Sequence, residues 1–205
     1  MRTLPVVYND GKFVIGQNIE DVAKCIGLRG SGLQSLPPEQ LIAKWVPVLQ
    51  AAQRFMLQLS DEQMQGRVIP NRDRAIWRLC YHIFRIPEAF LETAQDGAEF
   101  SSDSPNREPP PGQFTTAREV AGYGETVITR LKSWWEHLAD KSCQRQVQTY
   151  FGLQTTHMLY ERCTWHSAQH TRQMMAVVER LGLKPDGPLT PAQLAGLPLP
   201  ERLWE

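Results

Sequence analysis

Two histidines stand four residues apart in the stretch Thr164-Trp165-His166-Ser167-Ala168-Gln169-His170-Thr171-Arg172, inside a long segment with helical periodicity. At this spacing both imidazoles project from one face of a helix, about one turn apart. Two imidazoles placed in this way can hold one metal ion, but a protein metal site needs at least a third ligand. The candidate for this third ligand is His82.

The apolar stripes of two predicted helices include these histidines. In the predicted helix over residues 152–181, the stripe consists of Leu159, Cys163, His166, His170, Met174, Val177 and Leu181. In the predicted helix over residues 70–93, it consists of Ala75, Leu79, His82, Ile86 and Phe90. A buried imidazole must find a hydrogen bond or a metal. The pattern therefore fits either satisfied core histidines or a three-histidine centre with an open fourth position, which is an arrangement of catalytic zinc sites.

The other two histidines do not fit this geometry. His157 precedes His166 by nine residues, about half a helical turn out of phase, so we expect it on a polar face. His137 ends the third predicted helix, where we expect it to interact with the helix C-terminus.

Several neighbours of the histidines are candidates for supporting roles. Gln173 lies seven residues beyond His166 and faces the same way, so it is the best candidate to orient a metal ligand. Cys163 lies three residues before His166 and is either a soft fourth ligand or, as we favour, a small buried hydrophobe. Three aromatic residues are candidates for the walls of a pocket: Trp77, Tyr81 and Trp165.

The composition argues against several classes of protein. At 205 residues the chain is long enough for one domain with a full hydrophobic core. Lys and Arg together number 22, as do Asp and Glu, so no net charge favours nucleic acid or an anionic membrane as a partner. No run of about 18 apolar residues predicts a membrane span. The four scattered cysteines form no CxxC pair and follow no signal peptide, which indicates reduced thiols in a cytoplasmic protein.

Two further segments have the helical period. Apolar residues recur every three or four positions over residues 38–59, which predicts the first long helix. The third predicted helix begins at Thr115 or Thr116, whose pairing with Glu119 indicates a capping box, and continues to about His137.

Residues 95–114, between the second and third predicted helices, have no periodicity. Loops of this length are uncommon in compact domains unless they are functional or disordered. Such a loop is long enough to return the chain along a helix, so the second and third helices are expected to be parallel, as in bundles with a long crossover. The predicted fold is mainly α, a four-helix bundle preceded by a small β-hairpin and a short helix.

The N-terminal region predicts this hairpin. Two β-prone runs, residues 3–8 and 12–15, flank the turn signal Asn9-Asp10-Gly11. A short amphipathic helix over residues 19–28 follows, with Asn18 as its cap.

The order strand, strand, helix over residues 1–30 resembles the C-terminal half of a glutaredoxin or thioredoxin fold, in which a segment like Thr3-Leu4-Pro5 precedes the strand. The half that would carry the redox CxxC is absent. A bare hairpin with one helix is marginal in water, so we expect it to pack on the main domain or to pair with a second copy across a dimer.

The chain is expected to divide into three parts: a ββα segment over residues 1–30, a bundle over residues 36–182, and a Pro- and Leu-rich tail over residues 183–205. Residues 30–38 are a linker by composition. The tail contains one short helical segment, residues 191–195, and is expected to lie over the bundle or over a neighbouring subunit.

A helical chain with a histidine in its second long helix, within Trp77-Arg78-Leu79-Cys80-Tyr81-His82-Ile83-Phe84, and with the HxxxH pattern His166 to His170 in its last helix resembles the DinB/YfiT-like superfamily. The resemblance covers about residues 36–182. It implies an up-down-down-up four-helix bundle, a divalent metal ion, often nickel or zinc, held by three histidines, and frequent homodimers. Characterised members of this superfamily include thiol-dependent transferases and isomerases that use bacillithiol or mycothiol.

The leading hypothesis is a metal-dependent enzyme in which a low-molecular-weight thiol binds the metal of His82, His166 and His170 and attacks a small electrophile. The alternative is a metal-dependent hydrolase with the same ligands. Two other classes stay open: a non-catalytic metal-binding or small-ligand-binding protein, and a dimerisation module without metal. An open coordination position facing a pocket would favour an enzyme, whereas closure by Cys163 would favour a structural site.

Overall fold

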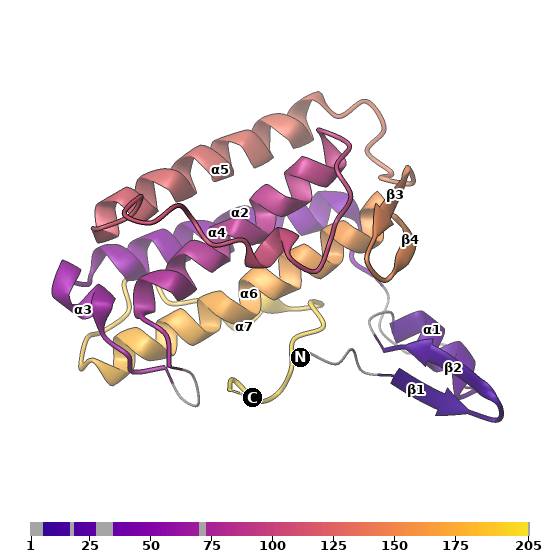
Figure 1. Cartoon of the computed structure of the whole chain (residues 1–205), viewed down its shortest axis with the longest axis horizontal. Coiled ribbons are helices and arrows are strands. Elements are labelled where there is room, and N and C mark those ends of the chain that lie inside the picture. Colours follow the sequence, from indigo (N-terminus) through magenta and orange to yellow (C-terminus); the bar gives the residue numbers. More distant parts are fainter. Residues whose placement is uncertain (1–5, 17–18, 28–34, 70–72, 205) are drawn as a thin grey trace.

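The computed structural model describes residues 6–16, 19–27, 35–69 and 73–204 (Figure 1). Three predictions lie outside these residues: the Thr3-Leu4-Pro5 segment, the Asn18 cap and the opening of the second long helix at Pro70-Asn71. Most of the predicted linker over residues 30–38 lies outside them as well.

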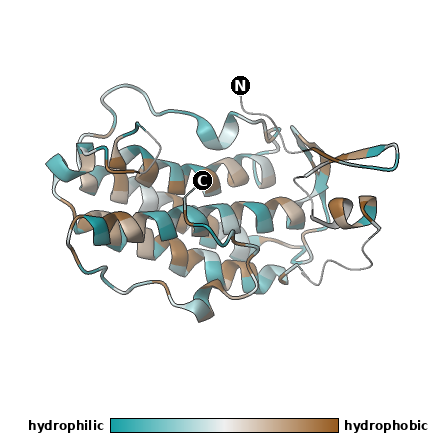
Figure 2. Cartoon of the chain, turned by 90° about the horizontal axis from the view of Figure 1, so that it is seen from below, coloured by the Kyte–Doolittle hydropathy of each residue, from teal (hydrophilic) through white to brown (hydrophobic). Residues whose placement is uncertain are grey.

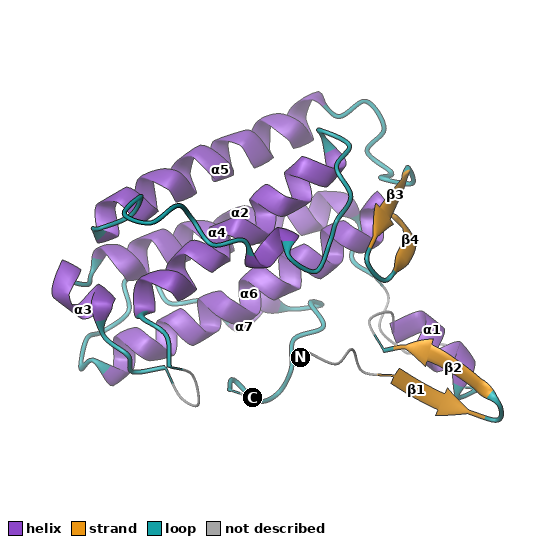
Figure 3. Cartoon of the chain, in the orientation of Figure 1, coloured by secondary structure: helices purple, strands orange, loops and turns teal. Residues whose placement is uncertain are grey.

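Long helices form the body of the described chain (Figures 1 and 3): α2 (Pro38–Leu57), α4 (Ile76–Ala94), α5 (Ala117–His137) and α6 (Thr156–Arg180). Figure 1 shows that α2 and α6 run in one direction and that α4 and α5 run in the opposite one. The second and third long helices are therefore parallel, as the long loop between them predicts. The predicted fold class, a mainly α bundle with up-down-down-up order, is confirmed.

The core lies between these helices. Helices α2 and α4 each pack against both α5 and α6. In Figure 2 the helices of the bundle carry both hydrophobic and hydrophilic residues. The ring of Trp45 in α2 lies 5.5 Å from the rings of both Phe90 in α4 and Tyr160 in α6. Phe90 in turn lies 4.9 Å from Trp134 in α5. Aromatic side chains from each helix thus meet in one cluster, which buries the stripes that the period predicts. None of the described helices is long and apolar enough to span a membrane.

The last long helix begins later than predicted. The structure places its start at Thr156, whereas Gly152–Thr155 form the strand β4, paired antiparallel with β3 (Gln146–Thr149). The Thr155 hydroxyl accepts a hydrogen bond from the first turn of α6, so a cap precedes the helix. The prediction of helix over residues 152–155 was wrong because four residues are too few to reveal a strand period.

Two helix starts depend on capping boxes. At the start of helix α3 (Asp61–Gln65), the Ser60 and Gln63 side chains each accept a hydrogen bond from the other residue's backbone. The capping box predicted between Thr116 and Glu119 is present at the start of α5.

The crossover loop between α4 and α5 is held at its start by the β3–β4 hairpin. The Phe100 N–H donates to the Gln148 carbonyl oxygen at 3.0 Å, and the Tyr150 N–H donates to the Phe100 carbonyl oxygen at 2.9 Å. Further along the loop, the 3-10 turn η1 (Ser104–Asn106) packs against α4. The loop thus becomes a wall beside α4.

The N-terminal hairpin consists of β1 (Val6–Asn9) and β2 (Lys12–Ile15), followed by α1 (Ile19–Cys25), which packs against both strands. We call residues 6–27 the ββα unit. Asp10 and Gly11 in the predicted turn have φ values of 46° and 77°, as a two-residue hairpin turn requires. The likeness of this unit to half a glutaredoxin stays a prediction.

The C-terminal tail lies over its own bundle. The Arg54 side chain of α2 donates to the backbone oxygens of Asp186 and Gly187, and Lys44 donates to that of Ala192. The short helix predicted in this tail is α7 (Pro191–Leu194).

Candidate metal centre

Helices α4 and α6 bring His82, His166 and His170 together. The ring centroid of His82 lies 5.4 Å from that of His166 and 4.8 Å from that of His170, and the last two rings are 4.8 Å apart. Each ring offers one nitrogen, and the three nitrogens all lie within 4.8 Å of one another. His170 is buried, whereas His82 and His166 are half-buried. The cluster therefore lies at the edge of the core.

A hydrogen bond between α4 and α6 lies at the height at which these histidines meet. Pro87 lies inside α4 and has no N–H, so the carbonyl of Ile83, four residues earlier, loses its usual helical donor. The Ser167 hydroxyl of α6 donates to this carbonyl oxygen at 3.4 Å. Because Ile83 follows His82 and Ser167 follows His166, the bond aligns the two helices at the level of the cluster.

Gln173 orients His170. Its Oε1 lies 2.7 Å from His170 Nδ1, and its Nε2 donates to the Leu203 carbonyl oxygen at 2.8 Å. A carbonyl can only accept, so the hydrogen-bond network assigns the amide nitrogen to Leu203 and the amide oxygen to His170. In the neutral ring of His170 the proton is therefore on Nδ1, and Nε2 presents its lone pair to the cluster.

Side chains of α6 next to Gln173 also hold the C-terminal tail beside His170. Gln169 Nε2 donates to the Leu203 carbonyl oxygen at 3.0 Å. Arg172 Nη1 donates to the carbonyl oxygen of Pro200 at 3.0 Å and to Gln169 Oε1 at 2.8 Å. Gln169 and Gln173 are both 7% exposed, so the contact between Gln173 and His170 is shielded from water.

The nitrogens of the cluster suit a metal ion. His166 Nε2 and His170 Nε2 are 3.1 Å apart. Two nitrogens that each lie about 2.05 Å from a tetrahedral ion are about 3.3 Å apart, so the observed distance is close to that of a ligand pair. Imidazole nitrogens favour zinc, nickel, copper or iron over magnesium and calcium, which prefer oxygen.

Cys163 does not belong to this group of ligand atoms in the described chain. Its side chain is 1% exposed and is part of the hydrophobic core. Burial raises the pKa of the Cys163 thiol to about 12, so the thiol keeps its proton at neutral pH. This placement favours the interpretation as a buried hydrophobe, and no fourth His, Cys, Asp or Glu of the described residues joins the three imidazoles.

The two remaining histidines make other contacts. His157 Nε2 lies 2.8 Å from the carbonyl oxygen of Leu36, and the side chain is half-buried. His137 is exposed, and its Nδ1 lies 2.9 Å from the carbonyl oxygen of Ser133 in the last turn of α5. Neither belongs to the cluster, in agreement with the helical phase.

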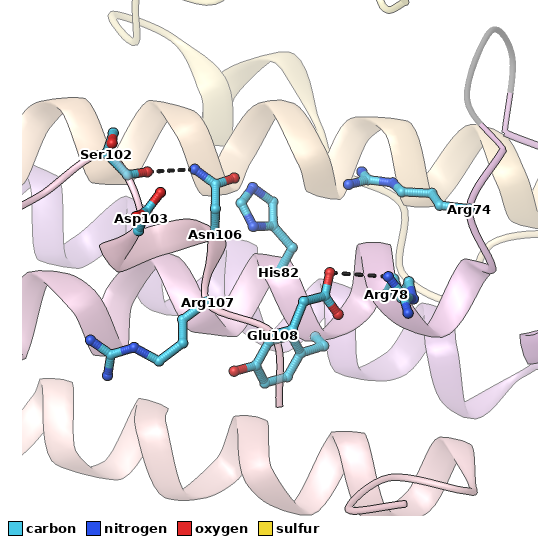
Figure 4. A pocket seen from close by; sticks show the side chains of 9 residues that line it. Arg74, Arg78, His82, Ser102, Asp103, Asn106, Arg107 and Glu108 are labelled. Atoms are coloured by element: carbon cyan, nitrogen blue, oxygen red, sulfur yellow. Dashed lines mark hydrogen bonds and ion pairs between the residues drawn. The ribbon is translucent and has the colours of Figure 1, made fainter. Parts of the chain in front are cut away.

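A pocket of about 600 Å³ opens beside His82 (Figure 4). Its lining consists of Arg74, Arg78, Tyr81, His82, Ser102, Asp103, Asn106, Arg107 and Glu108. The volume is that of a small-molecule site. Residues 102–108 belong to the crossover loop, so the long loop forms one wall. The sequence predicted no role for these loop residues or for the two arginines near the start of α4. The length of the loop was the only feature that indicated a function there.

Of the three aromatic residues predicted as pocket walls, Tyr81 is part of the lining, whereas Trp77 and Trp165 are not. Tyr81 lines the pocket, and burial raises its pKa, so the hydroxyl keeps its proton at neutral pH. The Trp165 ring lies 5.9 Å from that of His166. The Trp77 ring centroid lies 5.3 Å from the guanidinium of Arg78, which lines the pocket.

Comparisons with known proteins identify the fold. No model of a known protein family matches the chain, and no curated protein is a significant match. Among solved structures, a DinB-like protein from Bacillus cereus ATCC 10987 is similar, with a TM-score of 0.57, 18% identity, and coverage of 73% of this chain and 95% of that chain. YfiT from Bacillus subtilis, described as a probable metal-dependent hydrolase with an unusual four-helix bundle topology, has a TM-score of 0.50, 16% identity, and coverage of 70% and 89%. The chain therefore has the four-helix-bundle fold of DinB-like and YfiT-like proteins, with a three-histidine cluster in it.

Proposed function

We propose that the protein is a metal-dependent hydrolase whose divalent ion is held by His82, His166 and His170. The observation that carries the proposal is the convergence of three imidazole nitrogens within 4.8 Å beside a polar pocket. The description of YfiT as a probable metal-dependent hydrolase supports the choice of reaction. Zinc or nickel is the expected ion, because imidazole nitrogen suits both.

A divalent ion at this position supplies Lewis acidity to a water molecule or to a substrate oxygen. The chain's own residues prepare the site for that ion. Gln173 keeps the proton of His170 on Nδ1, so the lone pair of Nε2 faces the cluster. His82 lines the pocket, so a substrate that enters lies next to the ligand nitrogens. Tyr81 keeps its proton and can donate a hydrogen bond to that substrate from the pocket wall.

The expected low-molecular-weight thiol stays a prediction. A thiol and a water molecule would use the same histidines and the same pocket, and the described residues give the thiol no separate support. The position of Cys163 in the core and the pocket beside His82 favour an enzyme over a closed structural metal site.

Elemental analysis tests the metal site. Protein purified without a His tag should contain about one zinc or nickel per chain, and the His82→Ala and His166→Ala variants less than about 0.2. The control is His137→Ala, which removes an exposed imidazole outside the cluster and should leave the metal content unchanged. Wild-type protein with less than about 0.2 metal per chain after refolding with zinc or nickel would contradict the proposal.

A reaction screen tests the chemistry. The metal-loaded protein should hydrolyse at least one member of a panel of aryl esters, amides and phosphoesters, and His166→Ala should abolish this turnover. A parallel panel of glutathione, bacillithiol and mycothiol with an aryl halide tests the thiol reaction. Turnover in the second panel alone would replace the hydrolase by a thiol transferase.

A further inference from the structure

The pocket beside His82 is lined almost wholly by polar side chains. Small-molecule pockets are usually mainly apolar with a few polar groups. This lining instead contains three guanidinium groups and two carboxylates, with a serine, an asparagine and His82. An apolar substrate would leave these charged groups desolvated without partners, which is costly. The lining therefore favours a small charged ligand.

Two of the three arginines of the lining lie on the same side of His82. Figure 4 shows Arg74 and Arg78 on one side of His82 and Asp103 on the other. The lining has one more guanidinium than carboxylate, and a divalent ion at the histidines adds two further positive charges. The field beside the proposed metal is thus positive, and it favours an anion.

Arg107 belongs to an ion-pair network at the edge of the pocket. Its Nη1 lies 3.3 Å from Glu92 Oε1. The same Glu92 carboxylate already accepts two hydrogen bonds from the buried Arg85, at 2.9 and 2.6 Å. Arg85 also pairs with Glu88 at 2.7 Å, so the two guanidinium groups of this network face two carboxylates. The positive charge available to a ligand is therefore that of Arg74 and Arg78.

Arg78 is placed to exchange partners. Its Nη1 lies 3.1 Å from Glu108 Oε1, and the two side chains are 48% and 59% exposed. An ion pair with this exposure contributes little stability, so another anion can displace Glu108 at low cost. The Trp77 ring, 5.3 Å from the guanidinium, supports Arg78 independently of Glu108. The Glu108 carboxylate therefore stands where a ligand carboxylate or phosphate would bind.

We propose that the substrate is a small anion whose carboxylate or phosphate group binds Arg78 and Arg74 in place of Glu108. Glu108 is then an internal competitor that holds Arg78 in position until the substrate arrives. This inference rests on the proposed function, since it assigns the substrate class of the same site.

Substitutions of Arg78 and Glu108 should change the affinity for an anion in opposite directions, which gives a test. Metal-loaded full-length protein is titrated by calorimetry with succinate and with inorganic phosphate at low ionic strength, where screening is weak. Arg78→Gln should weaken binding of the preferred probe about tenfold or more, because it removes charge-assisted hydrogen bonds. Arg74→Gln should act in the same direction. Glu108→Gln should strengthen binding by up to about fivefold, because it removes the competitor.

The matched control is Arg130→Gln. Arg130 lies on α5, pairs with Asp96 at 2.7 Å, and is not part of the pocket lining. This variant makes the same chemical change elsewhere and should leave probe binding within about twofold. Thermal unfolding of each variant verifies that the fold is intact. The probe that binds more tightly identifies the anionic group as carboxylate or phosphate.

Metal content, measured on the same samples, separates this inference from the proposed function. Full metal occupancy with equal probe affinity in wild type and Arg78→Gln overturns the inference and leaves the metal site standing. Weaker binding in Glu108→Gln also overturns it. If the protein binds no metal, the proposed function fails, but a loss of probe binding in metal-free Arg78→Gln still supports the anion site.

Discussion

Trp45 in α2 and Phe13 in β2 are both large aromatic side chains, yet Trp45 is fully buried and Phe13 is 72% exposed. The long helices surround Trp45, whereas the described neighbours of β2 are one strand and α1. A helix or hairpin has one apolar face, and that face is stabilised where a second layer covers it. The bundle supplies its own second layer, and the ββα unit, in its described residues, leaves large apolar side chains exposed.

The largest expected effect is at the centre of the bundle. Trp45→Ala should lower the free energy of unfolding by about 3–5 kcal/mol, because it removes a buried ring and leaves a cavity. Urea denaturation measures the change. The control on the same helix is Leu57→Ala, at a position 54% exposed, which should cost less than about 0.5 kcal/mol. Equal losses in the two variants would break the contrast between covered and exposed positions.

Polar contacts differ between the two regions in the same way. Gln173 of the bundle is shielded from water. In the ββα unit, the Asn9 side chain donates to the Cys25 carbonyl oxygen at 2.7 Å and is exposed. Gln173→Leu should weaken metal binding by about 10- to 100-fold, because His170 loses the acceptor that fixes its tautomer. Competition with a chromogenic chelator measures the affinity. Gln173→Glu keeps an acceptor for Nδ1 and should restore binding to near the wild-type value.

Gln169→Leu is the control for the tail. This substitution removes a hydrogen bond to Leu203 and leaves the contact between Gln173 and His170 in place. Metal affinity should change by less than about threefold. A loss as large as that of Gln173→Leu would show that the tail, and not the amide acceptor, controls the ligand.

The capping box at the start of α5 should contribute a smaller, pH-dependent amount to stability. The Glu119 carboxylate accepts hydrogen bonds from the backbone and hydroxyl of Thr115 and from the backbone of Thr116, which lower its pKa to about 2 from the ordinary 4.5. A carboxyl group with a lower pKa in the folded state stabilises the fold above pH 4.5, and that contribution is lost as the pH falls towards 2. As the pH falls from 5 to 2, the thermal unfolding midpoint of Glu119→Gln should therefore decrease less than that of the wild type. An equal decrease in the two proteins would contradict this role.

The smallest effect is expected in the hairpin. Tyr8 and Phe13 face each other across β1 and β2 and are each 72% exposed. Their replacement by serine should change the free energy of unfolding by less than about 0.5 kcal/mol in a monomer. A loss above about 1.5 kcal/mol, together with a smaller sedimentation coefficient, would show that a second copy covers the hairpin, as the predicted homodimer requires.

The helices and the histidine cluster could be predicted because both depend on a period within one segment. The 3.6-residue repeat places His82, His166 and His170 inward, and their convergence then follows from packing two apolar stripes together. Short elements have too few residues to show a period, and so α3 and the β3–β4 hairpin were missed. The Ser60 and Gln63 pattern of α3 was present as a capping-box signal.

The pocket could not be predicted in the same way. Arg78 and Glu108 are thirty residues apart, and they meet because the crossover loop folds back along α4. No local pattern specifies where a loop without periodicity lies. Its position depends instead on the hydrogen bonds of Phe100 with Gln148 and Tyr150, which come from a strand pair later in the chain.

Pro87 has a consequence for assembly of the bundle. Smooth apolar faces allow one helix to slide along another by a turn, about 5.4 Å, with similar burial in either position. A slide of that size would carry His82 away from the other two imidazoles. The carbonyl of Ile83, freed by Pro87, meets the Ser167 hydroxyl in the observed alignment. A residue that weakens its own helix thus adds a polar contact that is specific to the observed alignment.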